Sequence, residues 1–119
     1  MSNTPNSSRN EKNWYVMYTR PRHEKKVKQQ LQELGIEHYL PLRKELKTWS
    51  DRKKWVEEPL FRSYIFICGD RIERYRAVRT YGTVRIVGFN GKPLVVEPEE
   101  IERIRLILKQ APAAESTHN

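Results

Sequence analysis

The residues that could carry chemistry in this chain are basic and aromatic, and none forms a catalytic arrangement. Glu57 and Glu58 are paired carboxylates, but adjacent residues of a strand point to opposite faces, so a charged strand edge is the simpler interpretation. The three histidines lack the spacing of metal ligands, and Cys68 is the only cysteine. No glycine-rich phosphate loop is present. We therefore expect no enzymatic activity, no metal and no other cofactor.

Charge favours a polyanionic partner. The chain has 119 residues and a net charge of +8, which fits one domain with a small core and a highly charged surface. Basic residues concentrate at positions 20–28, 43–54 and 71–85. Such clusters favour attraction to nucleic acid, while a solvated surface that only aids solubility is the alternative. No segment approaches the ~20 apolar residues of a membrane span, and the start of the chain does not resemble a signal peptide. A lone cysteine suits a reducing compartment, so we expect a cytoplasmic protein without membrane contact.

The aromatic residues offer a binding surface. Residues 57–67 form a dense aromatic and β-branched run that is typical of a strand, with Tyr64 and Phe66 on one face and Ile65 and Ile67 on the other. One face can build a core, and the second needs a cover. The aromatic residues on predicted strands or at their ends are Tyr15, Tyr18, Phe61, Tyr64, Phe66 and Phe89. One interpretation is that most of them are core; the other is an exposed apolar hollow that docks a partner helix.

The periodicity predicts the elements that position these residues. Strands are expected at 14–18, 36–46 (interrupted by Pro41), 55–67, 83–89 and 93–96, helices at 23–34, 70–82 and from Pro98 onward, and turns at Gly35, 50–54 and Asn90-Gly91. The residues expected to face inward from the helices are Val27, Leu31 and Leu34, then Ile72, Tyr75, Val78 and Tyr81, then Ile101, Ile104, Ile107 and Leu108.

This β-α-β-β-α-β order predicts an α+β fold. Specifically, it predicts a ferredoxin-like split βαβ sandwich, with an antiparallel four-stranded sheet, an added hairpin and a C-terminal helix. Residues 1–12 are polar and are expected to form a disordered leader, residues 13–110 the domain, and residues 111–119 a tail or the start of a linker.

Several of these segments, taken in order, carry a resemblance to a known family. They are residues 14–18, Arg20-Pro21-Arg22, Pro41, residues 58–61 with 64–67, and residues 84–89. Across about residues 14–109 the chain resembles the N-terminal domain of NusG-type transcription elongation factors. The Pro-Leu-Phe-x-x-Tyr-x-Phe pattern is most similar to the specialised RfaH and UpxY branch of that family.

The resemblance implies a function and a set of site residues. Such a domain grips the clamp helices of the largest RNA polymerase subunit, reaches an opposing subunit across the DNA channel, and suppresses pausing and termination. By position, the resemblance places Tyr18, Phe61, Tyr64 and Phe66 in the hollow with Phe89 at its border, Arg20, Arg22, His23 and Lys26 toward the non-template DNA strand, and Arg74 and Tyr75 near the second polymerase contact. We expect the domain to act as a monomer.

The chain also departs from the family pattern. Arg62 and Ser63 stand where the family commonly has proline followed by glycine or asparagine, which changes the bend and adds a charge beside the hollow. The second domain of the family, a small β-barrel with a KOW motif, is not found in these residues. Two alternatives stay open from the residues alone: an RNA-binding module with the same sheet topology, which would stack bases on its strand aromatics, and a ribosome-associated structural protein.

Overall fold

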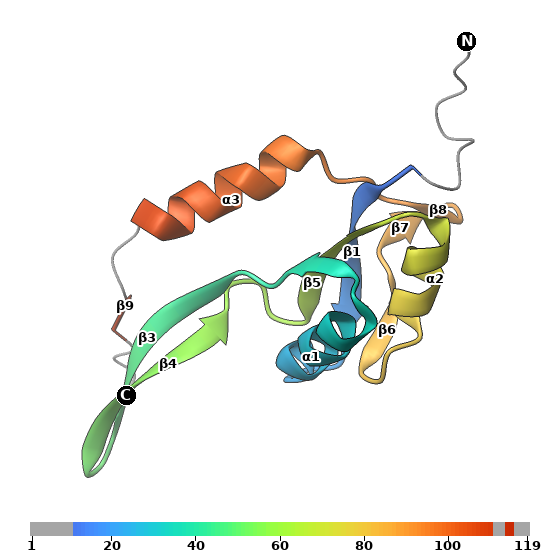
Figure 1. Ribbon diagram of the computed structural model, residues 1–119. Coiled ribbons are helices and arrows are strands. Elements are labelled where there is room, and N and C mark those ends of the chain that lie inside the picture. The colour runs from blue at the N-terminus through green and yellow to red at the C-terminus, as the bar shows by residue number, and fades with distance from the viewer. Residues whose placement is uncertain (1–10, 111–113, 116–119) are drawn as a thin grey trace.

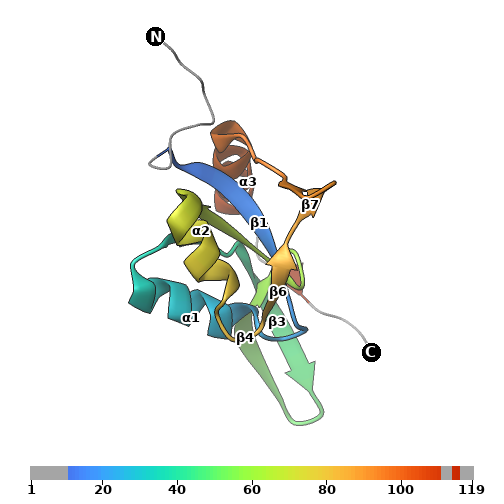
Figure 2. The same cartoon turned by 90° about the vertical axis from the view of Figure 1, so that its right-hand side faces the viewer.

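A four-stranded antiparallel sheet forms the centre of the protein in the computed structural model, which describes residues 11–110 and 114–115. The strand order is β2 (Glu37–Tyr39), β5 (Tyr64–Gly69), β1 (Asn13–Thr19) and β6 (Thr83–Ile86). Helices α1 (Glu24–Leu34) and α2 (Arg71–Val78) lie on one face, and α3 (Pro98–Gln110) starts on the other (Figure 1, Figure 2). The predicted α+β, split βαβ architecture is therefore confirmed. The proposed leader and tail lie largely outside the described residues.

The main core lies between the sheet and α1. Met17 of β1 pairs with Ile65 of β5, and both side chains are fully buried. Val27 and Leu31 of α1 pack on them from above. Burying an aliphatic side chain of this size contributes about 1.5–3 kcal/mol, so these contacts fix the position of α1 on the sheet.

The last turn of α1 differs from the prediction. Leu34 was expected to face inward but is exposed. Gly35 ends the helix with a left-handed φ of 73°, and the N–H of Ile36 donates to the Leu31 carbonyl. This closing turn brings Ile36 into the core in place of Leu34, as in a Schellman ending with its apolar contact.

Two of the predicted long strands are each divided in two, and one part of each forms a projecting hairpin. The strand expected at 36–46 breaks at Pro41 into β2 of the central sheet and β3 (Leu42–Trp49). The strand expected at 55–67 likewise breaks into β4 (Arg52–Pro59) and β5. The N–H of Leu60 donates to the Pro41 carbonyl at 2.8 Å, so the chain leaves and rejoins the body at one place. We call the β3–β4 hairpin the arm.

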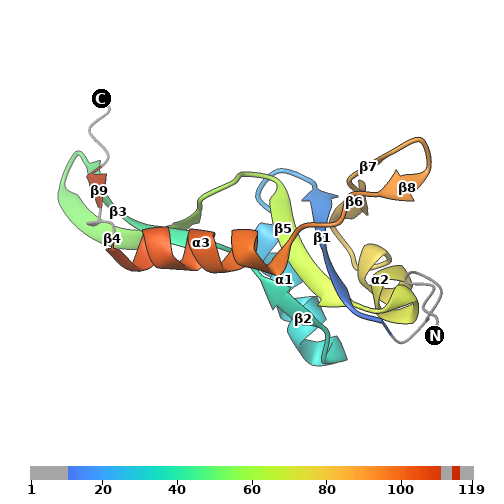
Figure 3. The ribbon, with the colours of Figure 1, turned by 90° about the horizontal axis from the view of Figure 1, so that it is seen from above.

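The arm makes the molecule elongated. It extends away from the body in Figure 1 and Figure 3, and the principal extents are 62 × 30 × 28 Å. Its two strands pair from Leu42↔Pro59 to Trp49↔Arg52, so the turn is tighter than the predicted 50–54 tip. The short strand β9 (Ala114–Glu115) runs parallel to β3 beside Glu45 and Leu46.

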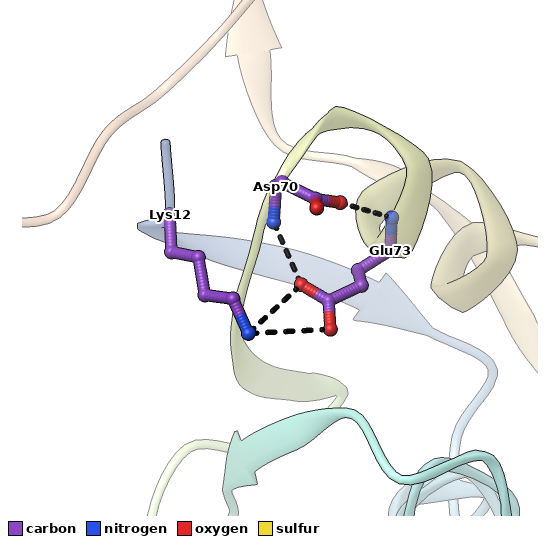
Figure 4. A network of polar contacts seen from close by, with 3 residues as sticks. All are labelled: Lys12, Asp70 and Glu73. Atoms are coloured by element: carbon purple, nitrogen blue, oxygen red, sulfur yellow. Dashed lines mark hydrogen bonds and ion pairs between the residues drawn. The ribbon is translucent and has the colours of Figure 1, made fainter. Parts of the chain in front are cut away.

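Helix α2 begins with the predicted capping box. The N–H of Glu73 donates to Asp70 Oδ1 at 2.8 Å, and the N–H of Asp70 donates to Glu73 Oε1 at 2.9 Å (Figure 4). Lys12 Nζ lies 3.4 Å from Glu73 and ties the start of β1 to this cap. The reciprocal hydrogen bonds satisfy two backbone donors that the helix itself leaves unpaired.

The prediction of which α2 residues pack against the sheet is wrong. Ile72 and Tyr75 are exposed, and the fully buried residue is Ala77, whose small side chain permits a close approach to the sheet. The helix ends at Val78 rather than near Gly82, so Tyr81 lies in the turn that follows. With only two turns, α2 contacts the sheet through a narrow strip.

The last third of the chain forms a second hairpin and α3. The strand predicted at 83–89 divides into β6 and β7 (Gly88–Phe89), and β7 pairs with β8 (Lys92–Pro93) around the predicted Asn90-Gly91 turn. Both turn residues have positive φ, 53° and 75°, as a type I′ turn requires. Of the strand predicted at 93–96, only β8 and a bridge from Val96 to Trp14 form.

Helix α3 covers part of the second face of the sheet. Ile101 is buried on Trp14 and Phe66, with Ile104 partly buried beside it. Ile107 was expected to face inward but is exposed, because α3 runs beyond the sheet toward the arm side of the molecule (Figure 3). Within the described part of the chain, no helix is long and apolar enough to cross a membrane.

Candidate functional site

Two tyrosines and an arginine form a ladder across the open part of the second sheet face. Tyr18 of β1 pairs with Tyr64 of β5 on one side and Arg85 of β6 on the other. The two tyrosine rings lie 5.5 Å apart between centroids, and the Arg85 guanidinium carbon lies 5.5 Å from the Tyr18 centroid. Such spacings allow ring–ring and cation–π attraction. Tyr64 keeps 39% of its surface exposed.

Phe61 and Phe66 extend this ladder toward α3, but only one of them is open. Phe61 is 40% exposed and meets Phe66 edge to face at a centroid distance of 6.2 Å. Phe66 is buried under Ile101 of α3. The prediction that Phe66 is an open ring of the hollow is therefore wrong. Phe66 is instead a buried ring on which Phe61 packs. We call the exposed Phe61 and Tyr64, together with the half-buried Tyr18, the aromatic patch.

Phe89 lies apart from the aromatic patch. It sits on β7, in the separate β7–β8 hairpin, and is 79% exposed. Among the described rings, none of the close aromatic pairs involves Phe89. The hairpin also lines a cavity of about 260 Å³ with Ile86. The structure does not bring Phe89 together with the other predicted rings.

A buried carboxylate holds the turn that carries Phe61 and Tyr64. Glu24, in the first turn of α1, is only 5% exposed, and its Oε2 accepts from the Ser63 N–H at 2.6 Å. Ser63 has a φ of 70°, a left-handed conformation that costs a non-glycine residue about 1–2 kcal/mol. This conformation explains why glycine or asparagine suits the position. Sequence reasoning missed Glu24, because a glutamate at a helix start usually faces solvent.

The predicted basic residues gather at the β1–α1 turn, next to the aromatic patch. Arg20, Arg22 and Lys26 are exposed, and Arg22 has a φ of 64°. His23 precedes the first helical residue, and its Nδ1 lies 3.0 Å from the Pro21 carbonyl oxygen. The structure therefore brings together the cationic part of the predicted site.

Tyr81 belongs to this basic turn, although sequence reasoning placed it on a helix. Its exposed ring lies 5.6 Å from the His23 ring and 5.9 Å from the Arg20 guanidinium carbon. Gln30 of α1 fixes the Tyr81 backbone by donating to its carbonyl at 2.8 Å and accepting from its N–H at 2.9 Å. The φ of 100° at the following Gly82 places Tyr81 in a turn, whereas the sequence carries no signal for its pairing with Gln30.

Arg74 and Tyr75 lie elsewhere, on α2 over the opposite sheet face. The Arg74 guanidinium carbon lies 4.8 Å from the Tyr15 ring centroid, and Tyr75 is exposed. Together with Ile72, Val78 and neighbouring residues they line an open cavity of about 450 Å³. Two surfaces of mixed aromatic and basic character therefore lie on opposite faces of one sheet.

The two resolved pKa shifts in the described part of the chain, at Cys68 and Tyr39, both favour the neutral form. Burial, together with the neighbouring Glu37 carboxylate, raises the pKa of Cys68 to about 11, so the thiol is a poor nucleophile. Burial also raises the pKa of Tyr39. The Arg105 guanidinium, whose carbon lies 4.7 Å from the Tyr39 ring centroid, partly lowers that pKa. Within the described residues, no three histidine, cysteine or carboxylate side chains gather as metal ligands would.

Comparison with known proteins identifies the family. The family described as "Transcription termination factor nusG" matches residues 12–105. Among solved structures, NusG of Thermotoga maritima, from a study of its domain interaction, superposes with a TM-score of 0.57 at 23% identity. The match covers 82% of this chain and 57% of that chain. A comparison with curated protein sequences gives no match. Because the family match spans most of the chain and the fold agrees with it, this chain belongs to the NusG family of transcription factors.

Proposed function

We propose that this domain is a transcription elongation and antitermination factor that binds the clamp helices of the largest RNA polymerase subunit through the aromatic patch. Factors of the NusG family work with RNA polymerase. The observation that carries the proposal is the exposure of Phe61 and Tyr64 on a fixed turn beside a cationic loop. Exposed aromatic side chains are the favoured anchors for an amphipathic partner helix.

The basic turn supports a contact with the non-template DNA strand. Arg20 follows Tyr18 by two residues, and its N–H donates to the Gly82 carbonyl. This hydrogen bond connects the turn after β1 to the turn before β6. The exposed cations Arg22 and Lys26 lie within this region, where phosphates would release counterions on binding. A polymerase-bound domain would thus hold exposed single-stranded DNA next to its protein anchor.

The α2 surface supports a second polymerase contact. Arg74 and Tyr75 lie on the face of the sheet opposite the aromatic patch, and the sheet core between them is fully buried at Met17 and Ile65. A rigid body with a binding surface on each face can bridge two subunits across a channel. Such a bridge would keep the clamp closed and thereby suppress pausing and termination. Residues 13–110 form the proposed polymerase-binding unit, of the RfaH and UpxY type.

The test is retention of core RNA polymerase by the immobilised protein. We expect Phe61→Ala with Tyr64→Ala to abolish retention, because each lost anchor costs about 2 kcal/mol or more and the two together weaken binding roughly a thousandfold. Phe89→Ala is the matched control, since Phe89 is exposed and aromatic but lies outside the patch. Circular dichroism of each variant checks that it remains folded.

Two outcomes would contradict the proposal. Full retention of polymerase by the double variant would exclude the aromatic patch as the anchor. Retention of free RNA in place of polymerase would instead favour an RNA-binding module. In a transcription assay with a paused template, the unmodified protein should shorten the pause, and the double variant should leave it unchanged.

A further inference from the structure

The outer half of the arm carries a concentration of positive charge that the proposed function does not use. Between positions 46 and 55 the arm has Lys47, Arg52, Lys53 and Lys54 against a single carboxylate, Asp51. Lys47 lies 3.6 Å from Glu58 nearer the body. Within the described residues, none of the other three cations has a carboxylate within ion-pair distance.

The strand register makes this charge unfavourable in the free protein. Lys47 stands directly opposite Lys54 across the two strands, and like charges in opposite positions destabilise a ribbon; Glu45 and Glu58, 3.9 and 3.6 Å from Lys47, offset part of this repulsion. Arg52, Lys53 and Lys54 are exposed consecutive residues, so their charges repel along the strand as well. A polyanion bound at this end of the arm would relieve both repulsions.

Two tryptophans lie among these cations with large exposed surfaces. Trp49 is 45% exposed and Trp55 is 54% exposed. Trp49 pairs with Arg52, and Trp55 pairs with Leu46; since Leu46 and Trp49 are an odd number of residues apart on β3, the two indoles face opposite sides of the arm. The Arg52 guanidinium carbon lies 5.5 Å from the Trp49 ring centroid.

A purely structural role does not account for this arrangement. The arm projects from the body (Figure 1, Figure 3), and among its described outer residues, 46–55, none is buried. Trp55 gains one apolar cross-strand neighbour, Leu46, whereas Trp49 has only Arg52 opposite. Proteins bind single-stranded nucleic acid by stacking its bases on exposed aromatic rings while nearby cations contact the phosphates. The outer arm has both kinds of side chain.

We propose that the outer arm binds single-stranded nucleic acid, with bases stacked on Trp49 and Trp55 and phosphates contacting Arg52, Lys53 and Lys54. The charge selects a polyanion, and the exposed ring faces select a strand whose bases are free to stack. This site is separate from the aromatic patch and the basic turn, so it goes beyond the proposed function. It acts whether or not the polymerase is present.

The test is the intrinsic fluorescence of the full chain titrated with dT or U oligomers of about 12 nucleotides and with a blunt duplex. Trp14 is buried, so quenching by stacking reports on Trp49 and Trp55. We expect strong quenching by single strands. Replacing either tryptophan by leucine should weaken binding about 5- to 150-fold, while replacement by phenylalanine, which retains a stacking face, should weaken it much less. The relative affinities of the dT and U oligomers show which strand is preferred.

A charge-matched pair of variants separates the arm from general basicity. Lys53→Gln with Lys54→Gln should lower the slope of log affinity against log salt by about 1.4, because each phosphate contact to a single strand contributes about 0.7. Lys12→Gln with Lys92→Gln removes the same charge at exposed positions away from the arm and should leave the slope unchanged.

Three results would overturn the proposal: equal affinity of the leucine and phenylalanine variants, quenching by the duplex as strong as by single strands, or an equal loss in both lysine pairs. The polymerase retention assay keeps the two proposals distinguishable. The Trp49→Leu variant should retain polymerase as the unmodified protein does, and the variant with both patch residues replaced should still bind oligomers.

Discussion

Removal of the Glu24 carboxylate should destabilise the domain and loosen the turn that carries the aromatic patch. Glu24 is 5% exposed and accepts the Ser63 N–H at 2.6 Å. Ser63 adopts a left-handed φ that it would leave if that hydrogen bond were lost. Replacing Glu24 therefore changes the packing of α1 and also removes the hydrogen bond that holds the turn at Ser63.

The magnitude follows from these contacts. A hydrogen bond to a charged group contributes about 1.5–3 kcal/mol, and an unpaired buried N–H costs about 1–3 kcal/mol. For Glu24→Ala we expect a loss of about 2–3 kcal/mol in the free energy of unfolding, which lowers Tm by about 10–20 °C in a domain of this size. Glu24→Gln retains an acceptor oxygen, so its loss should be about 1 kcal/mol.

Urea denaturation followed by circular dichroism measures both variants, with Glu33→Ala as an exposed glutamate control on the same helix. Polymerase retention at a temperature where each variant is folded measures the effect on the patch. Equal stability of Glu24→Ala and Glu24→Gln, within about 0.5 kcal/mol, would refute the role of the carboxylate as the partner of Ser63.

Three further predictions follow from local geometry. Ser63→Gly should raise the free energy of unfolding by about 0.5–1 kcal/mol, because relief of the left-handed strain exceeds the entropy cost of glycine; a lower urea midpoint would contradict this. Ile101→Ala should cost about 2–4 kcal/mol by leaving a cavity under α3, whereas Ile107→Ala, on the exposed side, should change the urea midpoint little. The raised pKa of Cys68, about 11, favours the neutral thiol in the folded state, so this contribution to stability is complete below pH 9 and is lost as the pH rises toward 11. Alkylation by iodoacetamide should therefore accelerate nearly tenfold between pH 9 and 10, and Glu37→Gln should shift that rise to lower pH; a rise of only about twofold, as for a thiol of ordinary pKa, would refute the shift.

The order of elements and the sheet topology could be predicted because their signals are local. Pro98 starts α3, Asp70 and Glu73 cap α2, and Asn90-Gly91 makes a two-residue turn. Each of these residues acts through its own backbone preference or a hydrogen bond within three residues. The alternation along β5 likewise predicted that Ile65 and Ile67 share one face of the sheet, and both side chains are fully buried.

The candidate site was harder to predict because burial depends on what covers each face. Phe66 and Phe61 have the same residue type and lie near each other in sequence, yet α3 covers one and leaves the other open. Nothing in the pattern of α3 shows that its inward face ends after Ile104. Tyr81 joined the basic turn through the side chain of Gln30, a long-range hydrogen-bonded pair that no spacing rule reveals.

The central position of β1 has a consequence for biosynthesis. Its neighbours β5 and β6 are made much later, since Asn13 pairs with Gly69 and Met17 with Ile86. A ribosome that adds about 5–20 residues per second needs about 3–10 s to synthesise the fifty residues between Thr19 and Gly69. Until those partners are made, Trp14, Tyr15 and Met17 of the nascent strand have no neighbouring strand with which to pair. Chaperone shielding of this emerging segment should therefore raise the yield of folded protein.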